Sequence, residues 1–347
     1  MNKIKLIGFD NLGENGNDGI RYAWRVDDNR NILESASFFN KTKDTICDIS
    51  GYTTSVSLGC VLRHLGCACK FCRTGNLLPF VRFLSAKEIA KQNILMVLAD
   101  MHNEEHIEVK SKKREFAYMG QGEPGYSYSQ LRIAIKMTDY IMNNVLKQEV
   151  HRHIVATSGV PEMLYALATD LKSNYYDSHI TLHYSLHAAE NRDFVMPINN
   201  LYEFKDMVGI LKTIGDITEE KVCLGVLLFN DFRPKNSSKA ISTNIDSLKN
   251  LLDLIDIKHF RFSFCEYNHS KDLGESNLFP MHDAQKINDF FKNAGYETKL
   301  FFSFGRREQS ACGMLAGKTP TNITSDKYKE LEYLADSLVE TAWKKIL

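Results

Sequence analysis

Short apolar segments that alternate with helical patterns are the feature of this sequence that most restricts its fold. Six such segments, rich in β-branched and aromatic residues, lie at residues 114–119, 151–159, 180–188, 221–230, 259–268 and 297–305. The stretches between them place apolar residues at i, i+3 and i+4, which is the spacing of one helical face. Because parallel strands need crossover connections, the alternation predicts a parallel sheet with helices packed across it. We therefore expect an α/β protein built as a partial (β/α)6 barrel or an open parallel sheet.

The two ends of the sequence predict smaller additions to this unit. Residues 1–50 contain short strand-like pieces in a polar background and should form a small β-rich segment. Residues 51–317 would make up the barrel, and residues 318–347 have the periodicity of an amphipathic helix that packs on its outside. Within the barrel, Gly215 follows a helical pattern at the position expected for a C-cap.

Composition and charge limit the classes of protein. The chain has 347 residues, with 43 basic and 43 acidic side chains and a formal net charge of zero. This balance excludes a strongly basic nucleic-acid coat protein and still permits a local basic patch. The apolar stretch before Asp10 is too short for a signal peptide, and no segment reaches the roughly 18 apolar residues of a membrane helix. We therefore expect a cytoplasmic protein with reduced thiols and no membrane association.

Four of the eight cysteines lie close together, at Cys60, Cys67, Cys69 and Cys72. In a reducing compartment, clustered thiols indicate metal or redox chemistry rather than structural disulfides. Three thiolates in one loop can bind an iron–sulfur cluster and leave one iron open to a small molecule. Zinc is the alternative, since these cysteines and His64 offer enough ligands for a closed tetrahedral site. Spacing alone leaves both metals open.

The stretch around these cysteines, CV-x4-GCA followed by CKFC-x-TG, resembles the cluster-binding region of the radical S-adenosylmethionine (SAM) enzymes. It is most similar to that of the RlmN/Cfr family of RNA adenine methyltransferases. Further motifs match that family in the same order between residues 20 and 317, namely MGQGEP, ATSGVP, YSLHAAENRD with MPIN, EYNHS and SACGMLAG. Each motif is short, but their shared order makes the resemblance specific.

The resemblance implies a radical-SAM barrel that binds a [4Fe-4S] cluster and SAM and methylates an adenine carbon of ribosomal or transfer RNA. Cys312 would first take a methyl group from one SAM molecule. A radical made from a second SAM would then activate that methyl group for addition to the base. Cys60 would release the product by attacking the Cys312 sulfur, which leaves a transient disulfide, and Glu34 would act as proton acceptor. The cluster would need a one-electron donor such as flavodoxin or ferredoxin.

The strand ends and the resemblance together give the candidate SAM-binding residues. Ligands of parallel sheets bind at the carboxyl ends of the strands, so Gly122 and Glu123 after the first predicted strand suit the α-amino group of SAM. Ser158, after the second predicted strand, suits its carboxylate or ribose. The remaining candidates end later strands and are Ser185, Leu186, His187 and Asn268.

Two departures from the family leave alternatives open. Cys67 and Cys69 are two residues closer together than the corresponding family cysteines. We expect the cluster on Cys67, Cys69 and Cys72, with Cys60, Cys69 and Cys72 as the alternative set. Family members also carry a helical N-terminal region that contributes to RNA binding, whereas about twenty residues precede the matching part here. The competing interpretations are a radical-SAM enzyme acting on a peptide or small molecule, and a non-catalytic metal- or cluster-bearing RNA-binding or redox protein.

Overall fold

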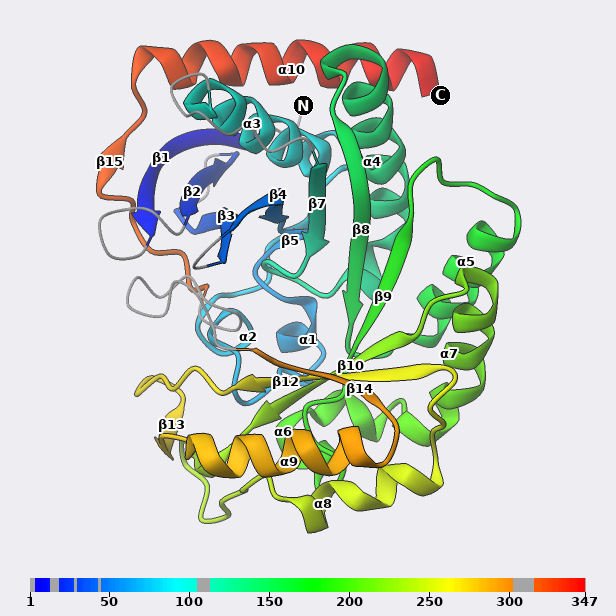
Figure 1. The fold of residues 1–347 in the computed structure, drawn as a ribbon. Helices are drawn as coiled ribbons and strands as arrows, with labels where there is room; N and C mark the ends of the chain where they lie inside the picture. Colours follow the sequence, from blue (N-terminus) through cyan, green and yellow to red (C-terminus); the bar gives the residue numbers. More distant parts are fainter. Residues whose placement is uncertain are drawn as a thin grey trace.

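The computed structural model describes residues 4–12, 19–27, 30–42, 45–104, 113–301 and 315–346. Its main feature is one curved sheet of eleven strands in the order β14-β12-β10-β9-β8-β7-β4-β3-β2-β1-β15 (Figure 1). These strands are β1 (Ile4–Leu12), β2 (Gly19–Val26), β3 (Ile32–Thr42), β4 (Thr45–Thr53), β7 (Lys113–Tyr118), β8 (Glu149–Thr157), β9 (Ile180–Ser185), β10 (Val222–Leu228), β12 (Phe260–Glu266), β14 (Glu297–Phe301) and β15 (Asn322–Ile323).

The strands from β4 to β14 in sheet order all pair in parallel. Six of them are the predicted apolar segments, so the expected strand and helix alternation is confirmed. The remaining parallel strand, β4, was not predicted. It buries Ser50 and Tyr52, and the Tyr52 hydroxyl donates to Asp100 at 2.9 Å. A strand with polar groups at its buried positions gives no apolar run for sequence analysis to find.

The first three strands extend this same sheet. β1, β2 and β3 are antiparallel neighbours, and β3 pairs antiparallel with β4, with Ser37 opposite Tyr52. The predicted β-rich segment is therefore present as a continuation of the barrel sheet, and the boundary expected at residue 50 falls inside β4. β15 pairs with β1 at Gly8 and Ile323, so residues that follow the barrel form the outer edge of the sheet.

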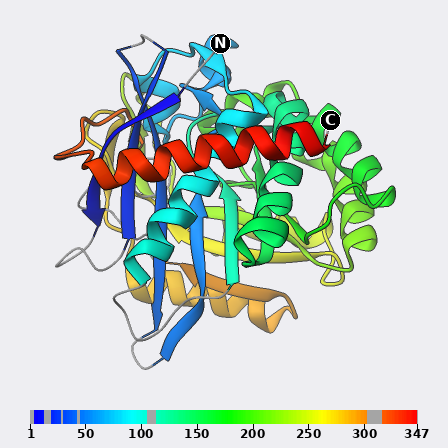
Figure 2. The same ribbon diagram turned by 90° about the horizontal axis from the view of Figure 1, so that it is seen from above.

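Helices cover the outer side of the curved parallel strands (Figure 1). The longer helices are α3 (Ala86–Glu104), α4 (Tyr128–Tyr140), α5 (Pro161–Lys172), α7 (Phe204–Thr218), α9 (Met281–Asn293) and α10 (Asp326–Ile346). Figure 2 shows α10 lying across α3, and an ion pair of 2.8 Å between Lys87 and Glu340 joins the two helices. The C-terminal helix thus packs on the outside, as its amphipathic pattern predicts.

α3 was not predicted, because it is buried on most of its surface and has no continuous polar face. Its buried polar side chains are hydrogen-bonded instead of solvated. Gln92 Nε2 donates to the Ser55 carbonyl at 3.1 Å, and Asn93 Nδ2 donates to the Tyr118 hydroxyl at 3.2 Å. A helix buried in this way lacks the one-sided apolar pattern by which amphipathic helices are found.

The predicted C-cap at Gly215 is wrong. α7 continues to Thr218, and the left-handed residue after it is Glu219, with φ of 55°. Gly215 lies inside the helix, where an added Cβ would be 3.2 Å from the carbonyl oxygen of Glu220. Its small size therefore serves close packing rather than helix termination.

Shorter elements occupy the loops. β5 (Ser57–Leu58) pairs with β6 (Arg82–Phe83), and between them lie α1 (Val61–His64) and α2 (Arg73–Leu77). The others are η2 (Pro124–Ser127), η3 (Ile141–Leu146), α6 (Arg192–Val195), η4 (Pro197–Asn200), β11 (Asn230–Pro234), α8 (Ile245–Lys249), η5 (Asn250–Asp253) and β13 (Gly274–Asn277). Within the described ranges, no helix combines the length and apolar character that crossing a membrane requires.

A buried ionic network fastens the first strands to the chain that follows the barrel. Arg21, fully buried on β2, donates to the carboxylates of Asp10 and Glu34 and to the Lys318 carbonyl at 2.9 Å. Asp10 accepts from the Thr321 backbone N–H at 2.7 Å, and Glu34 accepts from the Gly317 N–H at 2.7 Å. Residues 317–321 are therefore held against β1–β3 by charged groups that water does not reach.

Replacing Arg21 with methionine should lower the free energy of unfolding by about 3–5 kcal/mol, because two carboxylates would stay buried without their cation. Urea unfolding followed by circular dichroism measures the change. Lys249→Met is the control, since the pair between Lys249 and Asp246 is exposed and should contribute little. Equal effects of the two substitutions would contradict the role given to Arg21.

Candidate active site

The predicted SAM-binding residues lie on one edge of the sheet, at the carboxyl ends of parallel strands. Glu123 follows β7, Ser158 follows β8, and Ser185 ends β9. Asn268 follows β12 and is buried. The cysteine loop leaves the same edge, after β4. The structure therefore brings these residues to a common rim, as expected for ligand-binding residues of a parallel sheet.

The carboxylate of Glu123 is held on this rim by four hydrogen bonds. It is buried, and its Oε1 accepts from the Thr157 hydroxyl at 2.6 Å and the Gly125 N–H at 2.9 Å. Its Oε2 accepts from the Ser158 N–H at 3.0 Å and the Ser158 hydroxyl at 2.7 Å. Because two strand ends direct four donors to one side chain, the carboxylate is fixed before any ligand arrives. Ser158 acts here through Glu123, a contact that sequence analysis did not anticipate.

Gly122 has a structural reason to be glycine. Its φ is +102°, and an added Cβ would lie 2.2 Å from the Ser57 hydroxyl oxygen and 2.9 Å from a Val56 methyl carbon. The loop after β7 can therefore approach the loop after β4 closely, which brings Glu123 to the side of the sheet where the cysteines lie. A side chain at this position would force the two loops apart.

A buried arginine joins the ends of β8 and β9. Arg192 Nη2 donates to the carbonyls of Ser158 at 2.8 Å and Ser185 at 3.0 Å, and Nε donates to that of Leu186 at 3.1 Å. Nη1 donates to the Asn199 side chain at 2.7 Å. All four acceptors are uncharged oxygens. Arg192 thus fixes the backbone of three predicted SAM-binding residues while keeping its positive charge available to its surroundings.

His187 is held in the left-handed region, with φ of 57°. Burial, with Arg192 as a second cause, lowers the pKa of His187 to about 3, so the ring is neutral at physiological pH. Its Nδ1 is a buried polar atom with no hydrogen-bond partner among the described residues. The ring stands edge-on to Phe71 of the cysteine loop, 4.8 Å between centroids. An unsatisfied ring nitrogen at the rim is what a ligand-binding residue presents before its ligand binds.

The cysteine loop places the thiol of Cys69 near Glu123 and Arg192. Burial raises the pKa of Cys69, and the charges of Cys72, Cys60 and Glu123 raise it further, while Arg192 lowers it. Burial and the charge of Cys72 likewise raise the pKa of Cys60. The thiols of Cys60, Cys67, Cys69, Cys72, Cys223 and Cys265 are all free.

These surroundings fit the iron–sulfur cluster that the resemblance implies. Thiolates are the ligands of such clusters, and several buried thiols cannot ionise together without a compensating cation. Cluster iron would supply that charge, and binding would release the thiol protons. Among the described residues, no three His, Cys, Asp or Glu side chains lie close enough to share a single metal ion. An iron–sulfur cluster does not need such a group, because it is larger than a single ion and each of its thiolates binds a different iron.

Glu34 is buried rather than exposed on its strand. Besides its bonds to Arg21 and Gly317, Glu34 accepts a hydrogen bond at its Oε2 from Gln121 Nε2 at 3.4 Å. Gln121 belongs to the loop that carries Glu123. Glu34 therefore lies between the N-terminal strands and the rim. The predicted methyl carrier, Cys312, lies outside the described residues.

The chain that follows Cys312 is anchored to the cysteine loop. The Thr74 hydroxyl, two residues after Cys72, donates to the carbonyl of Leu315 at 2.6 Å. On the other side of the loop, the Lys70 N–H donates to the Val195 carbonyl at 2.9 Å. The loop thus bridges the segment at residues 315–317 and the turn after β9.

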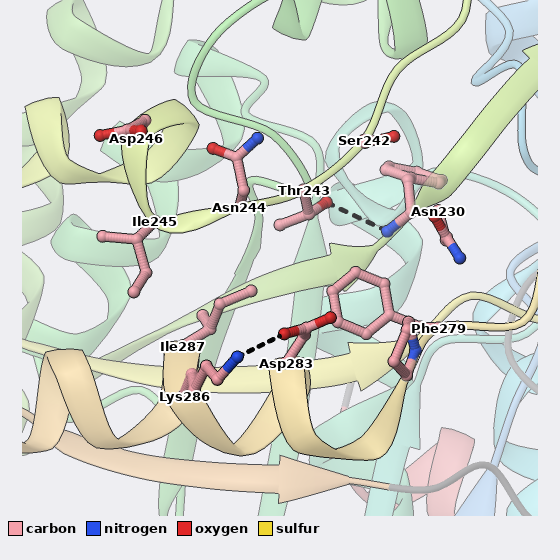
Figure 3. Close-up of a pocket in the computed structure, with 12 residues that line it drawn as sticks. Asn230, Ser242, Thr243, Asn244, Ile245, Asp246, Phe279, Asp283, Lys286 and Ile287 are labelled. Carbon is pink, nitrogen blue, oxygen red and sulfur yellow. Dashed lines mark hydrogen bonds and ion pairs between the residues drawn. The ribbon is translucent and has the colours of Figure 1, made fainter.

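A separate cavity of about 410 Å³ lies near the end of β10, between α8 and α9 (Figure 3). On its walls, the Thr243 hydroxyl accepts from the Phe229 N–H at 3.0 Å, and Lys286 pairs with Asp283 at 3.0 Å. Phe229 borders the cavity, and its ring lies 5.8 Å from that of Phe71, between centroids. Within the described chain, the lining includes none of the predicted site residues. The rim, rather than this cavity, is therefore the candidate active site.

Comparisons with known proteins agree with this location. No family model matches the chain. It is 28% identical over 309 residues to a protein of Fervidobacterium nodosum named probable dual-specificity RNA methyltransferase RlmN, covering 87% of this chain and 77% of that one. A protein of the same name from Pseudothermotoga lettingae is 27% identical over 306 residues, covering 85% and 75%. The chain is thus similar to proteins named RlmN over most of its length.

A solved structure supports the fold of the chain. The crystal structure of a radical SAM methyltransferase from Sphaerobacter thermophilus superposes with a TM-score of 0.69 at 18% identity, covering 91% of this chain and 82% of that one. The predicted α/β partial barrel of the radical-SAM type is thereby confirmed.

Sequence analysis missed two residues that organise the site. Arg192 stands in the matching motif YSLHAAENRD, where a charged residue just after a strand end was a usable signal. Gln121 occupies the position of a methionine in the family motif MGMGEP. Its Nε2 donates to the Ile32 carbonyl at 3.0 Å, and its Oε1 accepts from the Gly59 N–H at 3.4 Å. Gln121 therefore connects β3 with the start of the cysteine loop, which methionine could not do.

Replacing Arg192 with lysine should lower the free energy of unfolding by about 2–3 kcal/mol, because one ammonium group cannot reach four separated acceptors and buried carbonyls would lose their donors. Urea unfolding of the full chain measures the loss. Arg233→Lys on β11 is the matched control, because Arg233 is exposed and the change should be small. Similar losses in the two variants would contradict the clamping role of Arg192.

Proposed function

We propose that this RlmN/Cfr-like chain is a radical SAM methyltransferase that adds a methyl group to an adenine carbon of RNA through a methylated Cys312. The names of its relatives support the reaction and the substrate class. The observation that carries the proposal is the joint placement of buried thiols, Glu123 and Arg192 on one rim of a radical-SAM type barrel. The bound cluster and SAM would supply the one-electron chemistry, with the electron from a donor such as flavodoxin or ferredoxin.

Cys69 and Cys72 would hold the cluster in either of the ligand sets that the sequence leaves open. The Cys72 N–H donates to the Cys69 carbonyl at 3.1 Å, so the two thiols belong to one tight turn. One of Cys60 and Cys67 would supply the third thiolate, and the other would remain a free thiol of the loop. The free thiol is the candidate for the resolving role in product release.

Glu123 would receive the α-amino group of SAM. A carboxylate that already accepts four hydrogen bonds is held in one orientation, so it can receive an ammonium group without reorganising. Ser185, Leu186 and His187 would line the same ligand, with their backbone fixed by Arg192. Gly122 and Ser158 would support Glu123, and Asn268 would complete the rim at the end of β12.

The anchored segment after the barrel supports the role of Cys312. Leu315 follows Cys312 by three residues and is bound to Thr74 of the cysteine loop. Three residues of chain reach about 11 Å at most, so Cys312 would be tethered within reach of the loop. Glu34 binds Gly317 on the same segment and would stand near the substrate as the proton acceptor.

Mass spectrometry of the peptide that contains Cys312 tests this proposal. In protein produced with an intact cluster and SAM, the peptide should carry one added methylene group, because the methyl carrier is loaded before the RNA is modified. The peptide that contains Cys223 is the internal control and should stay unmodified. An unmodified Cys312 under turnover conditions would contradict methyl transfer through this residue.

RNA binding gives a second prediction. Binding of the full chain to transfer or ribosomal RNA fragments should weaken steeply as salt is raised, because each phosphate contact releases counterions and log Kd changes linearly with log salt. Fluorescence anisotropy at several salt concentrations measures the slope, with double-stranded DNA of equal length as the control polyanion. Weak or salt-insensitive RNA binding would favour a peptide or small-molecule substrate.

A further inference from the structure

We propose that the inner face of the parallel strands binds the phosphate backbone of the RNA substrate through Arg261 and Lys299. The inner face is the side of β9, β10, β12 and β14 that lies opposite the covering helices (Figure 1). Both cations lie outside the motifs that resemble the family. The inference rests on the proposed function in that it takes RNA as the substrate.

The strands that carry these cations have two different faces. Phe262 on β12 faces the helices, since its ring lies 4.4 Å from that of Phe291 on α9, between centroids. Tyr184 on β9 faces them too, with its ring 5.2 Å from that of Phe204 on α7. Successive side chains of a strand point to opposite sides, so the sequence neighbours of Phe262 and Tyr184 point to the inner face. These neighbours are His183, Ser185, Arg261 and Ser263.

The strand register places both cations close to the rim. Ser185, a candidate SAM-binding residue, pairs with Gly225 on β10. From Gly225 the same row of paired residues continues through Ser263 on β12 to Lys299 on β14. Lys299 therefore shares a row of the inner face with Ser185. Arg261 comes two residues before Ser263, so it lies about 7 Å further from the rim.

The row between Ser185 and Lys299 carries small side chains. Gly225 and Ser263 are both partly accessible. An added Cβ on Gly225 would meet no described atom closer than 3.7 Å, so close packing does not explain the glycine. Barrel interiors that form a packed core carry mostly bulky Val, Ile and Leu side chains at such positions. This row therefore does not fill the inner face as a packed core would.

Arg261 and Lys299 have no ion-pair partner among the described residues. Glu297 lies opposite Arg261 in the register, but its carboxylate pairs with Lys221 at 2.6 Å. The two cations also repel each other, because they lie in adjacent rows of one face. A phosphate group between them would compensate both charges.

His183 adds a neutral polar group beside Arg261. Cys223 pairs with His183 on one side and with Arg261 on the other, so all three share a row. Burial lowers the pKa of His183 to about 3, with the charge of Arg261 as the next cause, so the ring is neutral at physiological pH. Its Nε2 is a buried polar atom without a hydrogen-bond partner among the described residues. A neutral imidazole offers one N–H donor, which a phosphate oxygen can accept.

An aromatic ring next to Lys299 favours nucleic acid over a small free anion. Phe301 follows two residues later on β14 and pairs with Cys265, so it lies one row nearer the rim on the same face. Lys299 Nζ lies 5.8 Å from the centroid of its ring. Surfaces that bind single-stranded nucleic acid combine cations for the backbone with aromatic rings on which bases stack. The row sequence from Arg261 through Lys299 to Phe301 provides both kinds of group on the way to the rim.

The salt dependence of RNA binding tests this surface. In the full chain loaded with its cluster, Arg261→Met and Lys299→Met should each lower the slope of log Kd against log salt by about 1, because one phosphate contact is lost. Fluorescence anisotropy with a transfer or ribosomal RNA fragment that the wild type binds measures the slope. Arg261→Lys keeps the charge and should keep the slope. Lys292→Met is the matched control, because Lys292 is exposed on α9, on the helical side of the same strands.

A footprint on the wild-type protein guards against misfolded variants. Acetylation of lysines, read residue by residue by mass spectrometry, should become slower at Lys299 when the RNA is bound and stay unchanged at Lys292. Wild-type slopes in both methionine variants, or equal acetylation of Lys299 with and without RNA, would overturn this surface. The proposed function would then stand, because the wild type would still bind the RNA. A wild type whose RNA binding is weak or insensitive to salt would overturn both.

Discussion

The site is organised around a buried guanidinium that has no carboxylate bound to it. Arg192 connects the carbonyls at the ends of β8 and β9 and so fixes the spacing of two neighbouring strand ends. Burying an arginine is costly, and here the cost is offset by four oriented neutral oxygens. A carboxylate partner would cancel the charge, whereas neutral acceptors leave it to act on nearby groups. Arg192 can therefore both position the rim and stabilise negative charge on it.

The charge of Arg192 acts on Glu123 and on the thiol of Cys69. Burial lowers the pKa of Arg192, while Tyr184, Cys69 and Glu123 act in the opposite direction. Burial raises the pKa values of Cys60 and Cys69, so a nearby cation would be needed for these thiols to ionise. The net charge of zero for the whole chain does not reveal this local arrangement, because the sum averages over all surfaces.

Sequence analysis predicted the parts of the fold that have regular patterns. The six apolar segments became strands because their buried positions hold apolar residues, and the strand ends then placed Glu123, Ser158 and Ser185 on one rim. β4 and α3 were missed because their buried positions include polar side chains, such as Ser50 and Asn93, whose partners come from distant segments. Sequence analysis missed Arg192 and Gln121 for the same reason. Their role depends on which carbonyls lie nearby, and that is decided by the packing of several elements.

The N-terminal strands hold the segment that follows the barrel. Asp10 and Glu34 are held by Arg21, and they bind Thr321 and Gly317 on the segment that follows the barrel. That same segment is tied to the cysteine loop through Leu315. Residues 315–321 are therefore held on one side by the cysteine loop and on the other by the ionic network of β1–β3. A substitution in these strands should loosen residues 317–321 before it disturbs the cysteine loop, because that loop keeps its own anchors to the segment after β7 and to the turn after β9.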